Sequence, residues 1–299
     1  MDARKLDKML EQNLLELIRR TSVELPTDVI RAIDKGWRRE KKGSTAKYAL
    51  GVIRDNVIMA KDKSQPLCQD TGTIICYAEL PAWCDEPGFR KAYEKAVVKA
   101  TRVGYLRQNS VDSITGENSG TNLGPGSPSF HFHPVRGKTL KVRMMLKGGG
   151  CENVSTRYSL PDTRLDAGRD LAGVRKCLLD AVVQAQGKGC GPGILGVCIG
   201  GDRGSGYIAA KETLFREMDD LNEDKRLAKL EKQILREANG LGIGPMGFGG
   251  ETSVLGVKIT HRNRVPASFY VSIAYMCWAF RRNGCTITEA GRVRWLYDS

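Results

Sequence analysis

Hydrophobic residues recur with helical spacing through much of the first hundred residues. One stripe of leucines at i, i+4, i+8 and i+11 predicts an amphipathic N-terminal helix: Leu6, Leu10, Leu14 and Leu17. A second helix is predicted to begin with Thr27 as its N-cap and to end near Gly36. Further helices are expected over about 44–61 and 89–102, so the N-terminal part is predominantly helical.

Strand patterns become frequent after the first hundred residues. A first apolar strand is expected at 74–80, and the later strand-like segments are SFHFHPV, TLKVRMMLK, ILGVCIG, SVLGVKITH, SFYVSIAYM and TITEAGRVRW. Helices are expected at about 168–186 and in short pieces through 204–240. The segment 104–128, rich in Gly, Ser and Asn, predicts a long functional or mobile loop.

This pattern predicts an α/β (mixed α+β) fold, with a helical N-terminal subdomain packed on a mixed β-sheet subdomain. No segment of the sequence resembles a linker that would mark a domain boundary. We therefore expect one domain over 1–299, helical to about residue 105 and mixed sheet and helix from about 106.

Composition favours a globular protein of a reducing compartment. The 299 residues are 41% hydrophobic, enough for a buried core, and no run approaches the eighteen apolar residues of a membrane span. The N-terminus MDARKLDKMLEQN is charged and helical rather than signal-like. Nine cysteines, without framework spacing, favour free thiols. We expect a cytoplasmic protein that is not bound to a membrane.

The chain is basic, with 47 Lys and Arg against 34 Asp and Glu and a net charge of +13. This charge permits binding of nucleic acid or of small anionic substrates. The basic clusters are 36–43, 261–264, 280–282 and 292–294. No aromatic-interleaved nucleic-acid motif accompanies them, so solvated faces or a partner surface are expected. A noncatalytic basic protein that binds nucleic acid or an acidic partner remains the alternative function.

Three cysteines lie in loop-like settings or at the end of a strand: Cys68 in PLCQDTGT, Cys190 in GKGCGPG and Cys277 in AYMCWAF. Each of them is also compatible with a small core residue. Cys76, Cys177 and Cys198 lie in apolar segments, Cys84 and Cys285 in polar turns, and Cys151 after three glycines is ambiguous. The sequence contains no C-x₂-C pair of the kind that binds zinc. Three thiolates would leave one iron of a [4Fe–4S] cluster open, as a Lewis acid for a hydroxy acid.

Six segments carry a resemblance to a known family. They are PLCQDTGT, YLRQNS, KGGGCEN, GCGPGILGVCIGG, GLGIGPMGFGG and PASFYVSIAYMCWA. In this order they resemble the α-subunit, or N-terminal catalytic domain, of the iron–sulfur hydro-lyases that comprise class I fumarase and L(+)-tartrate dehydratase. The resemblance covers nearly the whole chain.

The resemblance implies an oxygen-sensitive [4Fe–4S] enzyme, with one iron not ligated by protein, that reversibly removes water from a 2-hydroxy dicarboxylate such as L-tartrate or malate. The family's cluster cysteines fall on Cys68, Cys190 and Cys277. The residues that match substrate-contacting positions are Gln69, Asp70, Arg107, Gly149 and Gly150. Of these, Gln69 and Asp70 are expected to be catalytic, and Arg107 is expected to clamp a substrate carboxylate through paired hydrogen bonds.

In this family the catalytic base comes from a second region, which this chain, ending at Ser299, lacks. We therefore expect a separate β-subunit that supplies the base and further substrate-binding residues, in an α₂β₂ assembly. One position departs from the fumarase pattern: Val265 stands where these fumarases carry a histidine, twelve residues before the third cluster cysteine. This leaves the identity of the hydroxy acid open.

A glycine-rich phosphate loop at GGDRGSG is the weakest interpretation, because the segment lacks the GK[ST] ending of such loops.

Overall fold

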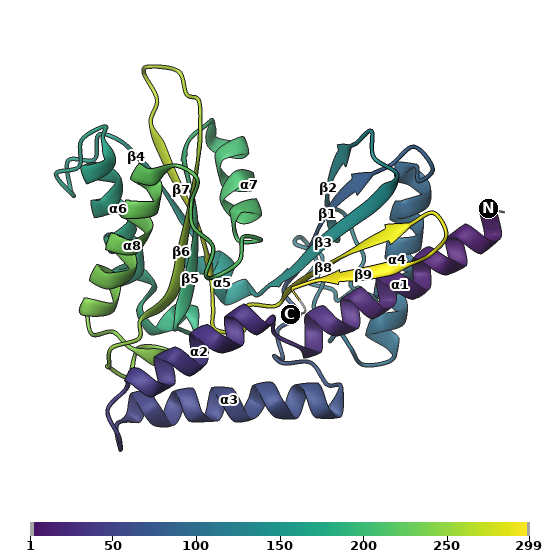
Figure 1. Ribbon diagram of the computed structural model, residues 1–299, viewed down its shortest axis with the longest axis horizontal. Helices are drawn as coiled ribbons and strands as arrows, with labels where there is room; N and C mark the ends of the chain where they lie inside the picture. Colours follow the sequence, from purple (N-terminus) through teal and green to yellow (C-terminus); the bar gives the residue numbers. More distant parts are fainter. Residues whose placement is uncertain (1–2, 298–299) are drawn as a thin grey trace. The chain divides into compact units, whose positions relative to one another are not determined.

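The structure is a computed structural model that describes residues 3–297 (Figure 1). The chain folds into two compact units, each assembled from separate stretches of sequence. The first comprises Met1–Thr27, Asp55–Gly149 and Ala279–Ser299, and the second comprises Asp28–Arg54 and Gly150–Trp278. In the described part of the chain, no helix is both long enough and apolar enough to cross a membrane.

The first unit is built on a mixed five-stranded sheet in the order β2-β1-β3-β8-β9. The strands are β1 (Thr73–Leu80), β2 (Ser129–Pro134), β3 (Thr139–Lys147), β8 (Arg282–Thr288) and β9 (Val293–Leu296). β1 and β2 run parallel, and the other neighbours are antiparallel. The central strand β3 ends at Lys147, immediately before the glycines that resemble a substrate-binding segment.

Helices α1 (Ala3–Val23) and α4 (Glu86–Arg102) pack with this sheet around one apolar core. The leucine stripe of α1 enters that core, where Leu10, Leu14 and Leu17 are at most 1% exposed. α4 begins at a firm cap, because the Asp85 carboxylate accepts a hydrogen bond of 2.6 Å from the Gly88 amide. The amphipathic N-terminal helix predicted from the leucines is confirmed.

The second unit contains a mixed four-stranded sheet in the order β4-β7-β5-β6. The strands are β4 (Thr156–Ser159), β5 (Gly193–Gly200), β6 (Val254–Arg262) and β7 (Tyr270–Met276). Helices α6 (Leu171–Ala185) and α8 (Lys225–Gly240) lie on one face and α7 (Arg203–Thr213) on the other (Figure 1). With a helix layer on both faces, all eight residues of β5 are buried, which explains its continuous apolar sequence.

Five further elements complete the structure of the described residues. They are α2 (Thr27–Arg39), α3 (Thr45–Lys63), α5 (Gly149–Val154), η1 (Gln186–Gly189) and η2 (Pro245–Gly247). The α/β class predicted from the sequence is confirmed, whereas β4 and α5 were not predicted. The single-domain description with a change near residue 105 stays a prediction.

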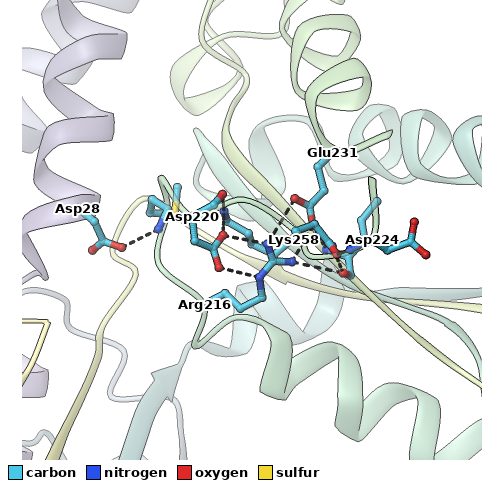
Figure 2. Close-up of polar contacts among 9 residues, drawn as sticks. Asp28, Arg216, Asp220, Asp224, Glu231 and Lys258 are labelled. Atoms are coloured by element: carbon cyan, nitrogen blue, oxygen red, sulfur yellow. Dashed lines mark hydrogen bonds and ion pairs between the residues drawn. The ribbon is translucent and has the colours of Figure 1, made fainter. Parts of the chain in front are cut away.

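A network of ion pairs fixes the loop between α7 and α8 in the second unit (Figure 2). Arg216 donates two hydrogen bonds of 2.8 Å to Asp220 and one of 2.7 Å to Glu231. The Lys258 ammonium, whose side chain is only 5% exposed, also binds Asp220. Glu231 in addition accepts a 2.7 Å bond from the Ile259 amide, so the loop, α8 and β6 are held together by satisfied charges.

Two local predictions about α2 are wrong. Gly36 lies inside α2 rather than at its end, and Thr27 is the first helical residue rather than the cap. A Cβ on Gly36 would stand 2.8 Å from Thr252 Cγ2, so this glycine permits close packing instead of ending the helix.

The basic cluster at 280–282 is not a solvated face. Arg281 and Arg282 are 1% and 0% exposed. Arg282 begins β8, pairs with Met145 and lies over the rings of Phe280 and Tyr297. Strand pairing therefore overrides the outward position that charge alone predicted.

Candidate functional site

The loop PLCQDTGT connects α3 to β1 in the first unit, as predicted. Leu67 anchors it in the core: its amide donates to the Ser22 carbonyl, and its carbonyl accepts from Asn56, both at 3.0 Å. The loop then turns outward, so Cys68 is half-buried and Gln69 exposed. The Cys68 thiol makes a weak 3.9 Å contact with Gln69 Oε1. A buried leucine thus positions a thiol that solvent can reach.

Asp70 joins three segments of the first unit that are far apart in sequence. Its Oδ1 accepts a 2.7 Å hydrogen bond from Asn109 Nδ2, and its Oδ2 accepts a 2.7 Å bond from the Gly149 amide. A carboxylate offers about four acceptor positions, so two bonds leave acceptor capacity for a further ligand. Predicted site residues Asp70 and Gly149 are therefore in direct contact.

Arg107 is positioned through its backbone. Thr71, which is 2% exposed, donates from Oγ1 to the Arg107 carbonyl at 2.8 Å and accepts from the Arg107 amide at 2.9 Å. Asn122 Nδ2 donates to the same carbonyl at 2.8 Å. The exposed Arg107 guanidinium makes no hydrogen bond or ion pair within residues 3–297. A fixed backbone with an unpaired guanidinium is suited to binding an anion.

Gly72 shows why a glycine is required beside this cluster. Its φ is +74°, and a Cβ there would lie 2.3 Å from the Lys147 carbonyl oxygen. The loop can therefore approach the end of β3 only with glycine at this position.

Cys190 and Cys277 lie close together in the second unit. Cys190 is exposed and follows η1 in the left-handed conformation, with φ +50°. Cys277 follows β7 and is 9% exposed. The Trp278 amide donates to the Cys190 carbonyl at 3.3 Å, which links the two cysteine segments. Cys151, which was ambiguous, joins this group, because its sulfur accepts from the Cys277 amide at 3.3 Å.

Gly150 also lies beside the Cys190 loop, since a Cβ built on it would stand 3.7 Å from the Lys188 carbonyl oxygen. The structure thus associates Gly149 with Asp70 and Gly150 with Cys190. Their contact with a substrate stays a prediction.

Burial raises the pKa of five other thiols. Desolvation raises the pKa of Cys84, Cys177 and Cys285 to about 12 and that of Cys198 to about 11, and it raises the pKa of Cys76 as well. Such thiols keep their protons at neutral pH and are poor metal ligands. Cys285, predicted in a polar turn, lies instead inside β8, where it is fully buried.

Three contributing residues were not predicted. Asn109 orients Asp70, and its only signal was its place inside the quoted segment YLRQNS. Thr71 was visible as part of PLCQDTGT, but nothing local revealed its contact with Arg107. Tyr275 lies in β7 beside the cysteine group, and burial, followed by the negative charge of Cys277, Cys151 and Cys190, raises its pKa.

The fit of these residues to the implied iron–sulfur cluster differs between the two units. In the described chain, no group of three or more His, Cys, Asp or Glu side chains is arranged to hold a metal ion. Cys68 belongs to the first unit, and Cys190 and Cys277 belong to the second. In the second unit the Cys190 and Cys277 segments are linked by the Trp278 amide beside Tyr275, a buried residue whose hydroxyl makes no hydrogen bond within residues 3–297. Cysteine sulfurs and a hydroxyl donor are the kinds of group that bind an anionic iron–sulfur cluster.

Val265 lies in the loop between β6 and β7 and is 65% exposed. It lines an open hollow of about 690 Å³ together with residues that include Arg203, Arg264 and Tyr270. Arg264 donates to the carbonyls of its own loop, at 3.2 Å to Val265 and 3.1 Å to Ser268. The position is therefore accessible, and a side chain there is free to vary.

The phosphate-loop interpretation of GGDRGSG is not supported by the hydrogen bonds at this turn. The Asp202 carboxylate caps α7 and accepts from the amides of Gly204 at 2.7 Å and Ser205 at 3.0 Å. These bonds lower the pKa of Asp202 to about 2, with the Ser205 hydroxyl as the largest cause. The amides that a phosphate would need already bind a carboxylate.

The chain is similar to several named proteins. A protein named "Putative fumarate hydratase class I" from Geobacillus stearothermophilus is 50% identical over 295 residues, 97% of this chain and 57% of that protein. The chain thus spans little more than half of that relative.

Two subunit-sized relatives match over most of their lengths. "Putative L(+)-tartrate dehydratase subunit alpha" from Methanocaldococcus jannaschii is 33% identical over 90% of this chain and 94% of that protein. "L(+)-tartrate dehydratase subunit alpha" from Escherichia coli (strain K12) is 28% identical over 87% of this chain and 85% of its own. The family model described as "Fumarate hydratase (Fumerase)" matches residues 11–286, nearly the whole chain, and the protein therefore belongs to the Fumerase family.

Proposed function

We propose that this chain is the α-subunit of a [4Fe–4S]-dependent hydro-lyase that reversibly removes water from a 2-hydroxy dicarboxylate. The observation that carries the proposal is the hydrogen-bonded set at Asp70. One carboxylate binds two segments, 39 and 79 residues away in sequence, and each matches a substrate-contacting segment of the family. Such long-range convergence is typical of a functional site rather than of a connecting loop.

Each residue has a role that follows from its surroundings. The unpaired Arg107 guanidinium binds one substrate carboxylate through two parallel hydrogen bonds. Asp70, oriented by Asn109 and Gly149, accepts a hydrogen bond from the substrate or from the released water. Gln69, exposed beside Cys68, contacts the same ligand. These groups orient the dicarboxylate before any bond is broken.

Cys68, Cys190 and Cys277 would hold the cluster, whose iron without a protein ligand supplies Lewis-acid chemistry at the substrate hydroxyl. The base that removes the proton from the neighbouring carbon is proposed to come from a β-subunit in an α₂β₂ assembly. Relatives named as subunit alpha support such a partner.

The substrate is proposed to be L-tartrate, giving oxaloacetate, or malate, giving fumarate. The 50% identity to a protein named as a class I fumarate hydratase supports malate. Val265, in place of the histidine expected of fumarases, supports tartrate or a related acid.

An anaerobic dehydration assay tests the proposal. The chain is co-purified with the product of the neighbouring gene and supplied with L-tartrate and with malate. We expect water elimination from at least one of them, and loss of that activity in Arg107→Ala. A matched control is Arg164→Ala, because Arg164 is also exposed but pairs with Asp180. A cluster-loaded complex that dehydrates neither acid would contradict the proposal.

A further inference from the structure

Tyr275 is held in a slot made by glycines of the Cys190 loop, all within the second unit. The residue is 3% exposed. A Cβ on Gly189 would stand 2.5 Å from Tyr275 Cε1, and one on Gly193 would stand 2.3 Å from its hydroxyl oxygen. Larger residues at either position would displace the phenol. The glycines of GCGPG therefore seat this ring directly against the segment that carries Cys190.

The Tyr275 hydroxyl differs from those of the neighbouring tyrosines. In the same unit, Tyr158 donates to Asp180 at 2.7 Å, and Tyr207 donates to Glu152 at 2.8 Å. Tyr275 makes no side-chain hydrogen bond in the described part of the chain. The hydroxyl oxygen is not among the fully buried atoms that lack a partner, so it is open to water or to a bound group.

The backbone around Tyr275 is hydrogen-bonded to the side chains of Ser155 and Cys151. Its amide donates to Ser155 Oγ at 3.0 Å, and the Cys277 amide donates to Cys151 Sγ at 3.3 Å. The pairing of β4 with β7 ends at Thr156 and Ile273, so β4 offers no backbone acceptor to the residues that follow in β7. Cys151 and Ser155, which are one helical turn apart, supply side-chain acceptors in its place. The ring and the two expected cluster ligands of this unit are thereby held together.

We propose that the Tyr275 hydroxyl donates a hydrogen bond to a sulfur of the cluster held by Cys190 and Cys277, and that this bond protects the cluster from oxidation. The inference rests on the proposed function. A phenol hydroxyl is a hydrogen-bond donor. Hydrogen bonds to cluster sulfurs stabilise the reduced, more negative state and raise the reduction potential. Tyr275 is thus a positioning residue that acts on the cluster, not on the substrate.

The test compares Tyr275→Phe with the matched control Tyr158→Phe in the anaerobic complex with its partner. We expect Tyr275→Phe to keep iron and sulfide at the wild-type level, to have a lower reduction potential, and to lose its cluster absorbance in air about tenfold faster, the order expected for one hydrogen bond to a charged acceptor. Tyr158→Phe loses a bond to Asp180 and should keep the wild-type potential and half-life.

Resonance Raman spectra of the wild type give a second measurement that needs no variant. The Fe–S stretching bands should shift in D₂O if an exchangeable proton is bonded to a cluster sulfur. A wild-type potential and half-life in Tyr275→Phe, or no shift in D₂O, would overturn the inference while leaving the hydro-lyase intact. A wild-type complex without iron or sulfide would instead contradict the proposed function itself.

Discussion

Removing the Asp70 carboxylate should loosen the segments that it joins. Asp70→Ala deletes both acceptors, and the Gly149 amide and the Asn109 side chain lose their bonds of 2.7 Å. Asp70 is half-buried, so water replaces part of this loss. At about 1 kcal/mol for each net hydrogen bond, the two bonds contribute about 2 kcal/mol to local order. That energy corresponds to a roughly thirtyfold change in the local opening equilibrium.

Asp70→Asn separates charge from geometry. The asparagine oxygen can accept from the Gly149 amide, and rotation of the Asn109 amide gives the new NH₂ group an acceptor. Both bonds are kept, but neutral bonds are about half as strong as charge-assisted ones. We expect the order of activity to be wild type, then Asp70→Asn, then Asp70→Ala, with each step about tenfold in kcat/KM.

Hydrogen exchange and kinetics together check this prediction. Exchange of the Gly149 amide should accelerate about thirtyfold in Asp70→Ala and much less in Asp70→Asn. Asp112→Ala is the control, because Asp112 bonds the amides of Ile114 and Thr115 at 2.8 Å at the exposed tip of the loop that carries Asn109. Its activity should remain at the wild-type level. Unchanged Gly149 exchange and unchanged kcat/KM in Asp70→Ala would refute the role given to this carboxylate.

Three further predictions concern stability and specificity. Burial alone would raise the pKa of Asp220, but hydrogen bonds from Arg216 and Lys258 outweigh it and hold the pKa below its ordinary value. Asp220→Asn should lower the free energy of unfolding at pH 7 by about 2 kcal/mol, less than for a fully buried pair because Asp220 is partly exposed. The stability contributed by Asp220 is complete above the unfolded pKa of about 3.9 and is lost as the pH falls through the lower folded pKa. Denaturant melts should therefore show the difference in free energy of unfolding between wild type and Asp220→Asn shrinking over that range. A difference that stays constant with pH would contradict this linkage. Arg281→Met should unfold at the wild-type temperature or higher, since Nε and Nη1 of this buried arginine have no hydrogen-bond partner among the described residues. If calorimetry showed a loss of more than about 2 kcal/mol in the free energy of unfolding, the charge would be compensated in the folded protein. Val265→His should leave the melting temperature unchanged, because Val265 is 65% exposed, and should raise kcat/KM for malate relative to L-tartrate; an unchanged ratio would remove this position from substrate selection.

The sequence predicted the elements well where periodicity and flanking residues agreed. The leucine stripe of α1 and the apolar run of β5 are of this kind. Predictions were wrong where a distant segment decides the local conformation. Gly36 resembles a helix end until Thr252 packs against it, and Cys285 resembles a turn residue until β3 pairs with β8.

The candidate site was likewise predicted only in part from the sequence. Cys68 and Cys190 were placed in loops because proline and glycine punctuate their surroundings, and Cys277 was placed at a strand end, which the structure bears out. Sequence reasoning from spacing alone did not reveal that Asn109 orients Asp70 or that Cys151 accepts from the Cys277 amide. Such contacts depend on how strands and loops pack, which no local pattern encodes.

Iron and sulfide content of the anaerobically purified complex tests the central proposal most directly. Wild type and Cys198→Ser, the latter changing a buried thiol of β5, should each contain close to four irons and four sulfides per α chain, as one [4Fe–4S] cluster requires. Cys68→Ser, Cys190→Ser and Cys277→Ser should each lose the cluster and the dehydratase activity. Absence of iron from the wild type, or equal loss in all four variants, would contradict the assignment of these three thiols as the cluster ligands.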